Sequence, residues 1–314
     1  MKALSSKEIY GNWATLLLPL NAGDNIDYPA LEDEIDVLIS MEVNGIYSNG
    51  TAGEFYTQTE EEFDRINGIL AEKCNAAGMP FQVGCSQMSP QLSLERVRRA
   101  IALEPSAIQL ILPDWFPPGM SEIIEYLEVM ARAAEPVGLV LYNPPHGKRK
   151  LSPEEFGQIR AAGIPLAGCK VAGGDARWYR AMKQHVPDLS LFVPGHHLAT
   201  GFTRGAAGAY SNVACLHPGA AQRWYEMMKT DIEGALELEK RIQAFIEGYI
   251  VPYIREQGYS NQAADKFMAA IGGWGPVGPR LRWPYKWIPE TEAAAVRDRG
   301  RELLPEFFSK YSGT

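Results

Sequence analysis

The chain has 314 residues, of which 46% are hydrophobic and 22% are charged, and its 30 Lys and Arg against 38 Asp and Glu give a formal net charge of −8. This composition is that of an ordinary globular protein and excludes a disordered or collagen-like chain. The acidic balance argues against a general nucleic-acid binder, which would carry a basic face. The length fits one large α/β domain or two of average size.

Short apolar runs alternate with amphipathic segments along most of the chain. The runs carry few charges, as expected for strands that are buried on both faces of a parallel sheet. The predicted strands are residues 13–18, 45–48, 81–84, 107–112, 138–142, 166–170, 189–193 and 207–211.

The segments between these runs have the spacing of helices. Residues 27–41, 59–77 and 121–134 each carry apolar side chains three or four positions apart, which predicts one buried face for each helix. The expected N-caps are Thr59, which has Glu62 three positions later, Ser121 and Ser152.

Eight strand–helix units in roughly 220 residues predict an α/β fold of the (β/α)₈ TIM barrel type, and an open doubly wound sheet is the alternative. The chain carries more helix than the eighth unit needs. We therefore expect a barrel over residues 1–225, with a C-terminal helical extension over residues 226–314 that packs on the barrel within the same domain unit.

The cysteines and the N-terminus indicate the cellular setting. Cysteines 74, 85, 169 and 215 form no CxxC pair, and we expect a reduced, cytoplasmic protein. The apolar run at residues 16–18 ends at Pro19 and is too short for a signal-peptide core or a membrane span. No membrane partner is therefore predicted.

Lys170 is the most informative residue, because it closes the predicted strand 166–170 among apolar neighbours. A TIM barrel places its active site at this end of its strands. Burial lowers the pKa of a lysine, and a neutral amine can attack a ketone to form a Schiff base. The alternative is a lysine that reaches the barrel rim or pairs with an acid such as Asp175.

Tyr142 and Thr51 lie at two further strand ends. Tyr142 closes the strand 138–142, and a phenol in the barrel mouth can transfer protons; the alternative is a buried ring whose hydroxyl bonds the backbone. Thr51 lies between Gly50 and Gly53. Glycines let the backbone approach a ligand, and the amides of such a turn can bind a carboxylate. The alternative is a tight strand-to-helix turn.

The order of these motifs resembles the dihydrodipicolinate synthase/N-acetylneuraminate lyase family of class I pyruvate-dependent aldolases. The motifs are GTAGE at residues 50–54, YNPP at residues 142–145, and a lysine followed by glycines at residues 170–174. The resemblance covers about residues 9–290 and implies a lyase that forms a Schiff base with pyruvate or another 2-oxo acid, without a metal or another cofactor. It implies that Lys170 forms the Schiff base, that Tyr142 is the proton shuttle and that Thr51 orients Tyr142.

The resemblance also implies substrate contacts and assembly. The turn formed by Gly50, Thr51 and Ala52 would hold the carboxylate of the 2-oxo acid through its amides. Gly195 matches a pocket glycine after the seventh strand, and Tyr210 matches a position on the eighth strand that faces the site. A homo-oligomer, either a tetramer or a dimer, is the family's assembly.

Three positions depart from the synthase branch of this family. Ala52 replaces a second hydroxyl residue, and Gly147 replaces an arginine that grips the carboxylate of the second substrate. The loop at residues 113–116 lacks the tyrosine that reaches into a neighbouring subunit. We therefore expect the Schiff-base chemistry to persist and the second substrate to differ, which favours aldol cleavage, condensation or dehydration over the reaction of lysine biosynthesis.

Other residues near the strand ends are candidate substrate contacts, namely Trp115, Lys148 and His196. His196 and His197 follow the seventh strand and can act as acid–base groups near neutral pH, or can begin the next helix. A metal role is disfavoured, because no third ligand has the spacing of a metal site.

Two further motifs are set aside, and one alternative function is kept. GxGxxG at residues 273–278 contains a proline and follows a predicted helix, so it does not indicate a dinucleotide site. The basic and aromatic run at residues 280–287 is typical of a packed tail or a subunit contact rather than of a nucleic-acid site. The alternative to a lyase is a barrel that binds a 2-oxo acid as a sensor or regulator, because Ala52, Gly147 and the Trp115 loop leave the family's relay incomplete.

Overall fold

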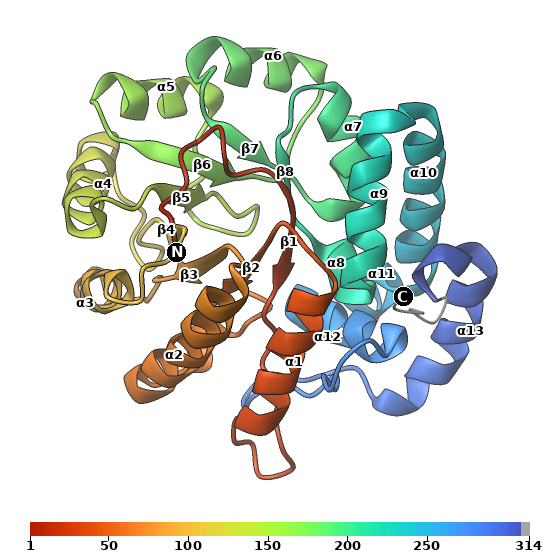
Figure 1. The fold of residues 1–314 in the computed structure, drawn as a ribbon. Helices are drawn as coiled ribbons and strands as arrows, with labels where there is room; N and C mark the ends of the chain where they lie inside the picture. The colour runs from red at the N-terminus through yellow and green to blue at the C-terminus, as the bar shows by residue number, and fades with distance from the viewer. Residues whose placement is uncertain (309–314) are drawn as a thin grey trace.

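In the computed structural model, which describes residues 1–308, eight strands pair in parallel and in sequential order until the last meets the first (Figure 1). The first strand thus pairs with both the second and the eighth. The TIM-barrel prediction is confirmed, and the open doubly wound sheet is excluded. The strands are β1 (Gly11–Thr15), β2 (Gly45–Ser48), β3 (Phe81–Gly84), β4 (Ala107–Ile111), β5 (Leu139–Tyr142), β6 (Leu166–Lys170), β7 (Ser190–Phe192) and β8 (Gly208–Tyr210).

Seven strands end within one residue of the prediction, but the predicted first strand, 13–18, is wrong at both ends. Gly11 already pairs with Gly208 of β8, although a glycine gives no strand signal in the sequence. Residues 16–18 lie beyond β1 and are buried in the layer between strands and helices, which explains their apolar character.

Helices follow the strands around the barrel and continue beyond it (Figure 1). Those of the barrel are α1 (Tyr28–Ser40), α2 (Glu60–Ala77), α3 (Pro90–Ile101), α4 (Met120–Ala134), α5 (Pro153–Ala161), α6 (Ala176–His185), α7 (Leu198–Thr203) and α8 (Asn212–Leu216). The C-terminal helices are α9 (Pro218–Thr230), α10 (Ile232–Tyr249), α11 (Val251–Arg255), α12 (Asn261–Gly272) and α13 (Ala293–Leu303). The proposed domain boundary at residue 225 falls within α9. None of the described helices is both long and apolar enough to cross a membrane.

The helix caps follow the sequence with one exception. Thr59 and Ser152 each form the expected capping box, with Glu62 and Glu155 respectively. The cap predicted at Ser121 is wrong, because α4 begins one residue earlier and its N-cap is Gly119. Glu122 Oε2 accepts the Gly119 N–H at 2.6 Å, so a side chain of the first turn satisfies the N-cap amide, whereas no N-cap side chain accepts an amide of the helix.

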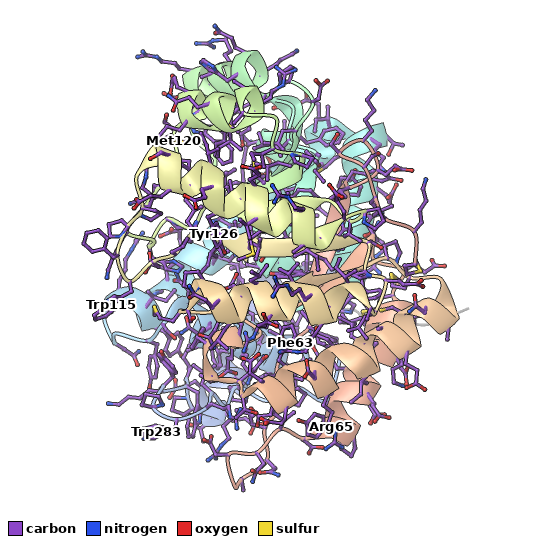
Figure 2. All side chains as sticks on the ribbon, turned by 90° about the vertical axis from the view of Figure 1, so that its left-hand side faces the viewer. Phe63, Arg65, Trp115, Met120, Tyr126 and Trp283 are labelled. Atoms are coloured by element: carbon purple, nitrogen blue, oxygen red, sulfur yellow. The ribbon has the colours of Figure 1, made fainter. Side chains whose placement is uncertain are left out.

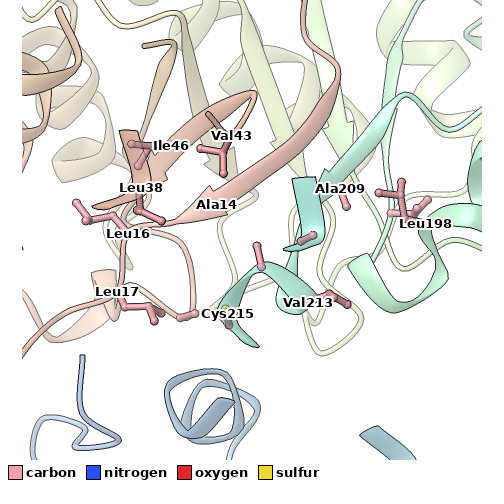
Figure 3. Packing of buried hydrophobic residues seen from close by; sticks show 14 of the residues in the cluster. Ala14, Leu16, Leu17, Leu38, Val43, Ile46, Leu198, Ala209, Val213 and Cys215 are labelled. Atoms are coloured by element: carbon pink, nitrogen blue, oxygen red, sulfur yellow. The ribbon is translucent and has the colours of Figure 1, made fainter. Parts of the chain in front are cut away.

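The core has two layers, because successive residues of a strand point to opposite faces. The outer layer lies between strands and helices, and Figure 3 shows part of it around Leu16, Leu38 and Ile46. The inner layer fills the barrel with Ile9, Trp13, Tyr47, Ala107, Val140, Ala167, Phe192 and Tyr210. Cys169 belongs to the outer layer, so the next residue, Lys170, faces the inside of the barrel.

A buried ion pair attaches the C-terminal helices to the barrel. Lys266 on α12 and Glu54 in the loop after β2 are both 0% exposed, and Lys266 Nζ lies 2.9 Å from Glu54 Oε1. The same ammonium donates to the carbonyl oxygens of Leu18 and Arg280. Glu54 Oε2 accepts the N–H of Arg282 at 2.9 Å. This contact fixes α12 against the loop that carries Thr51.

The two motifs that were set aside are parts of this packing. Residues 273–278 follow α12, and Gly273 is its C-cap in the left-handed conformation. In the run 280–287, the Arg282 side chain pairs with Glu62 at 2.6 Å. The packed-tail interpretation of this run fits that pairing.

Candidate active site

A cavity of about 310 Å³ opens at the C-terminal ends of the barrel strands. The barrel and the C-terminal helices α10 to α12 both line it. It brings together six of the residues selected from the sequence, namely Thr51, Ala52, Tyr142, Lys170, His196 and Tyr210. Residues far apart in the sequence therefore meet at the edge where barrel enzymes hold their substrates.

Lys170 sits at the end of β6 among three tyrosine rings. Its Nζ lies 4.3 Å from the ring centroid of Tyr142, 5.2 Å from that of Tyr47 and 5.7 Å from that of Tyr210. It donates a long hydrogen bond of 3.5 Å to Tyr47 Oη. Asp175, the partner considered from the sequence, instead accepts the Trp178 N–H at 2.8 Å as the N-cap of α6.

This surrounding activates the amine. Burial lowers the pKa of Lys170 from 10.5 to about 8, because the ammonium loses its hydration. At pH 7 a pKa of about 8 leaves about one tenth of the amine neutral, against about one part in 3,000 for a pKa of 10.5. A lysine amine in this state can act as a nucleophile near neutral pH.

Tyr142 lies beside this amine, and Thr51 lines the same cavity. Burial raises the pKa of Tyr142 to about 12, and interaction with the Thr51 side chain acts in the opposite direction by a smaller amount. The phenol therefore keeps its proton at neutral pH. It can donate that proton to a charge that develops beside Lys170.

Asp265 is a site residue that the sequence did not reveal. It lies on α12 and lines the cavity with Lys170. Desolvation raises the pKa of Asp265 to about 7, and the positive charge of Lys170 opposes this rise. Its negative charge in turn raises the pKa of Lys170 and of Tyr142. Asp265 stands next to Lys266 within a helix, and no strand end marks it in the sequence as a site residue.

His196 reaches the cavity, and His197 does not. His196 Nδ1 lies 2.9 Å from Asn212 Nδ2 and 3.2 Å from Asn212 Oδ1. Burial lowers the pKa of His196 to about 4, so this ring is neutral at pH 7 and can act as a hydrogen-bonding group. His197 is exposed and contacts Gln243 on α10.

Four residues expected to contact substrate do not line the cavity. A Cβ at Gly195 would lie 2.3 Å from Ser211 Oγ, and one at Gly50 would lie 2.6 Å from the Tyr47 ring. The missing side chains of Gly195 and Gly50 leave room for Ser211 and for the Tyr47 ring, respectively. The two glycines thus affect the packing around the site without lining the cavity. Trp115 is 76% exposed and projects from the surface (Figure 2). Lys148 Nζ donates to the Trp115 carbonyl at 2.9 Å.

Within residues 1–308, no three His, Cys, Asp or Glu side chains are grouped so that they could hold a metal ion. The titratable groups that line the cavity include Lys170, the carboxylates of Glu247 and Asp265, the histidines His146 and His196, and tyrosine hydroxyls. This set fits chemistry by amine attack and proton transfer.

The fold is a TIM barrel, and a lysine of lowered pKa lies at the C-terminal end of its sixth strand. Residues 8–290 match the model of the dihydrodipicolinate synthetase family, and the chain belongs to this family. Its members are lyases that hold pyruvate as a Schiff base on a lysine, without a metal or other cofactor.

The named relatives reported for this chain are synthases. The 4-hydroxy-tetrahydrodipicolinate synthase of Thermomicrobium roseum is 26% identical over 235 residues, which cover 74% of this chain and 76% of the relative. That of Coxiella burnetii is 27% identical over 233 residues, which cover 74% of this chain and 78% of the relative.

Solved structures share the fold. YagE of Escherichia coli K12, solved in complex with pyruvate, has a TM-score of 0.81 at 19% identity and covers 94% of this chain and 98% of its own. N-acetylneuraminate lyase of Fusobacterium nucleatum has a TM-score of 0.80 at 20% identity, with coverage of 95% and 99%.

Proposed function

We propose that this protein cleaves, condenses or dehydrates a 2-oxo acid through a Schiff base on Lys170. The observation that carries the proposal is the position of Lys170. Its amine has a lowered pKa and shares one cavity with Tyr142 and Asp265. The Thr51 and Ala52 turn lines the same cavity and is the proposed holder of the substrate carboxylate.

The chemistry follows from these groups. The neutral amine of Lys170 attacks the C2 carbonyl of the 2-oxo acid, and loss of water leaves an iminium ion. This cation withdraws electrons from the bond between C3 and C4, or favours loss of a C3 proton followed by a leaving hydroxide. We propose Tyr142 as the proton shuttle at the oxygen that leaves C2. We propose that Asp265, whose pKa is about 7, carries the proton of the second half of the reaction.

The second substrate separates this proposal from the synthase reaction. The curated relatives carry the synthase name, but Gly147 stands where that branch has its carboxylate-gripping arginine. We therefore favour another 2-oxo acid. Incubation with a panel of 4-hydroxy-2-oxo acids and measurement of pyruvate tests this choice. An aldolase releases pyruvate, a dehydratase keeps the carbon skeleton, and a sensor without catalysis gives no multiple turnover.

Changing Tyr142 to phenylalanine removes the shuttle hydroxyl and keeps the ring beside Lys170. We expect turnover to fall by roughly 10²- to 10⁴-fold, the usual contribution of a general acid or base, while pyruvate still binds. Steady-state kinetics and calorimetric titration with pyruvate measure the two effects. A Tyr142→Phe enzyme with unchanged turnover contradicts the assigned role. The matched control is Tyr10→Phe, because Tyr10 is exposed at the opposite end of β1.

The pH dependence of Schiff-base formation reports the state of Lys170. Because only the neutral amine attacks, we expect the rate of borohydride trapping with pyruvate to rise about tenfold per pH unit below pH 8 and to level off above it. The Asp265 carboxylate raises the pKa of Lys170, so Asp265→Asn should move this limb to lower pH. Trapping at pH 7 then becomes faster, whereas turnover falls by roughly 10²- to 10⁴-fold.

These opposite shifts distinguish a proton-transfer role from damage to the fold, which would slow both processes. Asp175→Asn is the control, since Asp175 caps α6 and does not line the cavity. If Asp265→Asn changes neither the pH dependence of trapping nor turnover, Asp265 has no part in the mechanism.

A further inference from the structure

A second cavity, of about 690 Å³, adjoins the first at the barrel mouth. The two cavities share Thr51, Tyr142, His146, Ile254 and Asn261 among their lining residues, and Lys170 lines the smaller one. A substrate that is bound to Lys170 and extends past Tyr142 therefore enters the larger cavity, which we call the outer chamber.

The outer chamber has no unpaired lysine or arginine for a substrate carboxylate among its described lining residues, which also include His146. Among the described residues that line it, Arg149 is the one lysine or arginine. Its guanidinium is paired with Glu155 and also donates to the carbonyls of Pro118 and Lys150. Asp114 adds a carboxylate to the same wall. Lys148 and Lys150 flank Arg149 in this loop and do not line the chamber. Lys148 Nζ donates to the Trp115 carbonyl.

The inner cavity has no lysine or arginine other than Lys170 among its described lining residues, and His146 lines it together with the outer chamber. Once Lys170 is an iminium ion, its charge is matched by the carboxylate of the bound 2-oxo acid and by Asp265. Glu247 lines the same cavity, and its carboxylate is paired with Arg255 at 3.0 Å. A second carboxylate buried here is an uncompensated charge, which proteins avoid.

An aromatic wall forms one side of the outer chamber. Phe55 and Tyr56 follow the Thr51 turn, and their ring centroids lie 5.4 Å apart in an edge-to-face arrangement. The Tyr56 ring meets that of Tyr285 in the same manner at 5.1 Å. Leu112 and Ile254 add apolar surface. Such a wall gives an aromatic partner further edge-to-face contacts.

We infer that the second substrate, or the fragment released on cleavage, is an uncharged aromatic aldehyde. This inference rests on the proposed Schiff-base chemistry of Lys170. In the condensing direction, C3 of the pyruvate enamine bonds to the aldehyde carbon, and the aldehyde oxygen takes up a proton. Water then hydrolyses the iminium ion and releases a 4-aryl-4-hydroxy-2-oxo acid together with the free amine of Lys170. Cleavage is the reverse of these steps.

The test supplies pyruvate with each of three aldehydes and compares kcat/KM. Benzaldehyde is uncharged and aromatic, glyceraldehyde is uncharged and hydroxylated, and succinic semialdehyde carries a carboxylate. We expect kcat/KM for benzaldehyde to exceed that for glyceraldehyde by about 10-fold or more, and that for succinic semialdehyde by about 100-fold or more. Preference for either of the other aldehydes overturns the inference.

Two variants examine the chamber itself. Tyr56→Ala should lower kcat/KM for benzaldehyde by about 10-fold and leave the trapping of pyruvate unchanged, whereas Tyr10→Ala, at the other end of the barrel, should change neither. Glu155→Gln frees the Arg149 guanidinium, so the ratio of succinic semialdehyde to benzaldehyde turnover should rise by about 10-fold. An unchanged ratio shows that the pairing of Arg149 does not set the selectivity.

Borohydride trapping in the same preparation distinguishes failure of the proposed Schiff-base function from failure of the inferred substrate class. Failure to trap pyruvate on Lys170 rejects the proposed function. Successful trapping with no turnover of benzaldehyde leaves the proposed function standing and rejects the inferred substrate class.

Discussion

Replacing Lys170 by alanine is expected to abolish catalysis and the trapping of pyruvate together. The amine is the proposed nucleophile, and no other lysine lines the cavity among the described residues. Loss of a nucleophile commonly lowers turnover by about 10⁴-fold or more. Substrate turnover and borohydride trapping, both measured on the purified variant, check this expectation.

The matched control for this variant is Lys148→Ala. Lys148 lies in the loop after β5, and its Nζ is 4.8 Å from the Trp115 ring centroid, outside both cavities. We expect it to keep turnover and trapping. A Lys170→Ala enzyme that still turns over any 2-oxo acid at an ordinary rate contradicts the Schiff-base mechanism, provided that its melting curve matches that of the parent protein.

Removing the ammonium of Lys266 is expected to cause the largest loss of stability. In Lys266→Met the Glu54 carboxylate is left at 0% exposure without its counter-ion. Breaking a buried pair in this way costs about 3–5 kcal/mol of the free energy of unfolding. Glu54 also holds a left-handed backbone conformation, with φ of 53°, and the pair helps to keep it there. Denaturant unfolding followed by circular dichroism measures the loss.

Two further variants test the origin of this effect. Adding Glu54→Gln to Lys266→Met removes the stranded charge, so the double variant should recover part of the lost stability. Lys240→Ala breaks an exposed pair with Glu237 and should leave unfolding unchanged within error. Equal stability of Lys266→Met and the parent protein contradicts the proposed anchoring of α12 by this ion pair.

The barrel could be predicted from the sequence because its signals are local. Buried parallel strands produce apolar runs, and polar turns separate these runs from the helices. The observed bounds of β2 and β6 are therefore the same as the predicted ones. The wrong bounds predicted for β1 show what an apolar run does not distinguish. The run at residues 16–18 indicates burial, and a loop that packs under helices is buried in the same way as a strand.

The site was predictable where a residue ends a strand and not where tertiary packing decides its direction. Lys170 and Tyr142 close β6 and β5, and strand alternation together with barrel closure turns both into the cavity. Asp265 gives no such signal, because the docking of α12 through Lys266 sets which way its side chain faces. The place of Trp115 in the chain predicts a substrate contact, but its loop directs the side chain to the surface.

The Schiff base on Lys170 is tested most directly by reduction of the intact protein with borohydride in the presence of pyruvate, followed by mass spectrometry of its peptides. We expect one reduced pyruvate adduct per chain, located on Lys170 and absent when pyruvate is omitted. Absence of an adduct on Lys170 with pyruvate and with a panel of other 2-oxo acids, or an adduct on a different lysine, would contradict it.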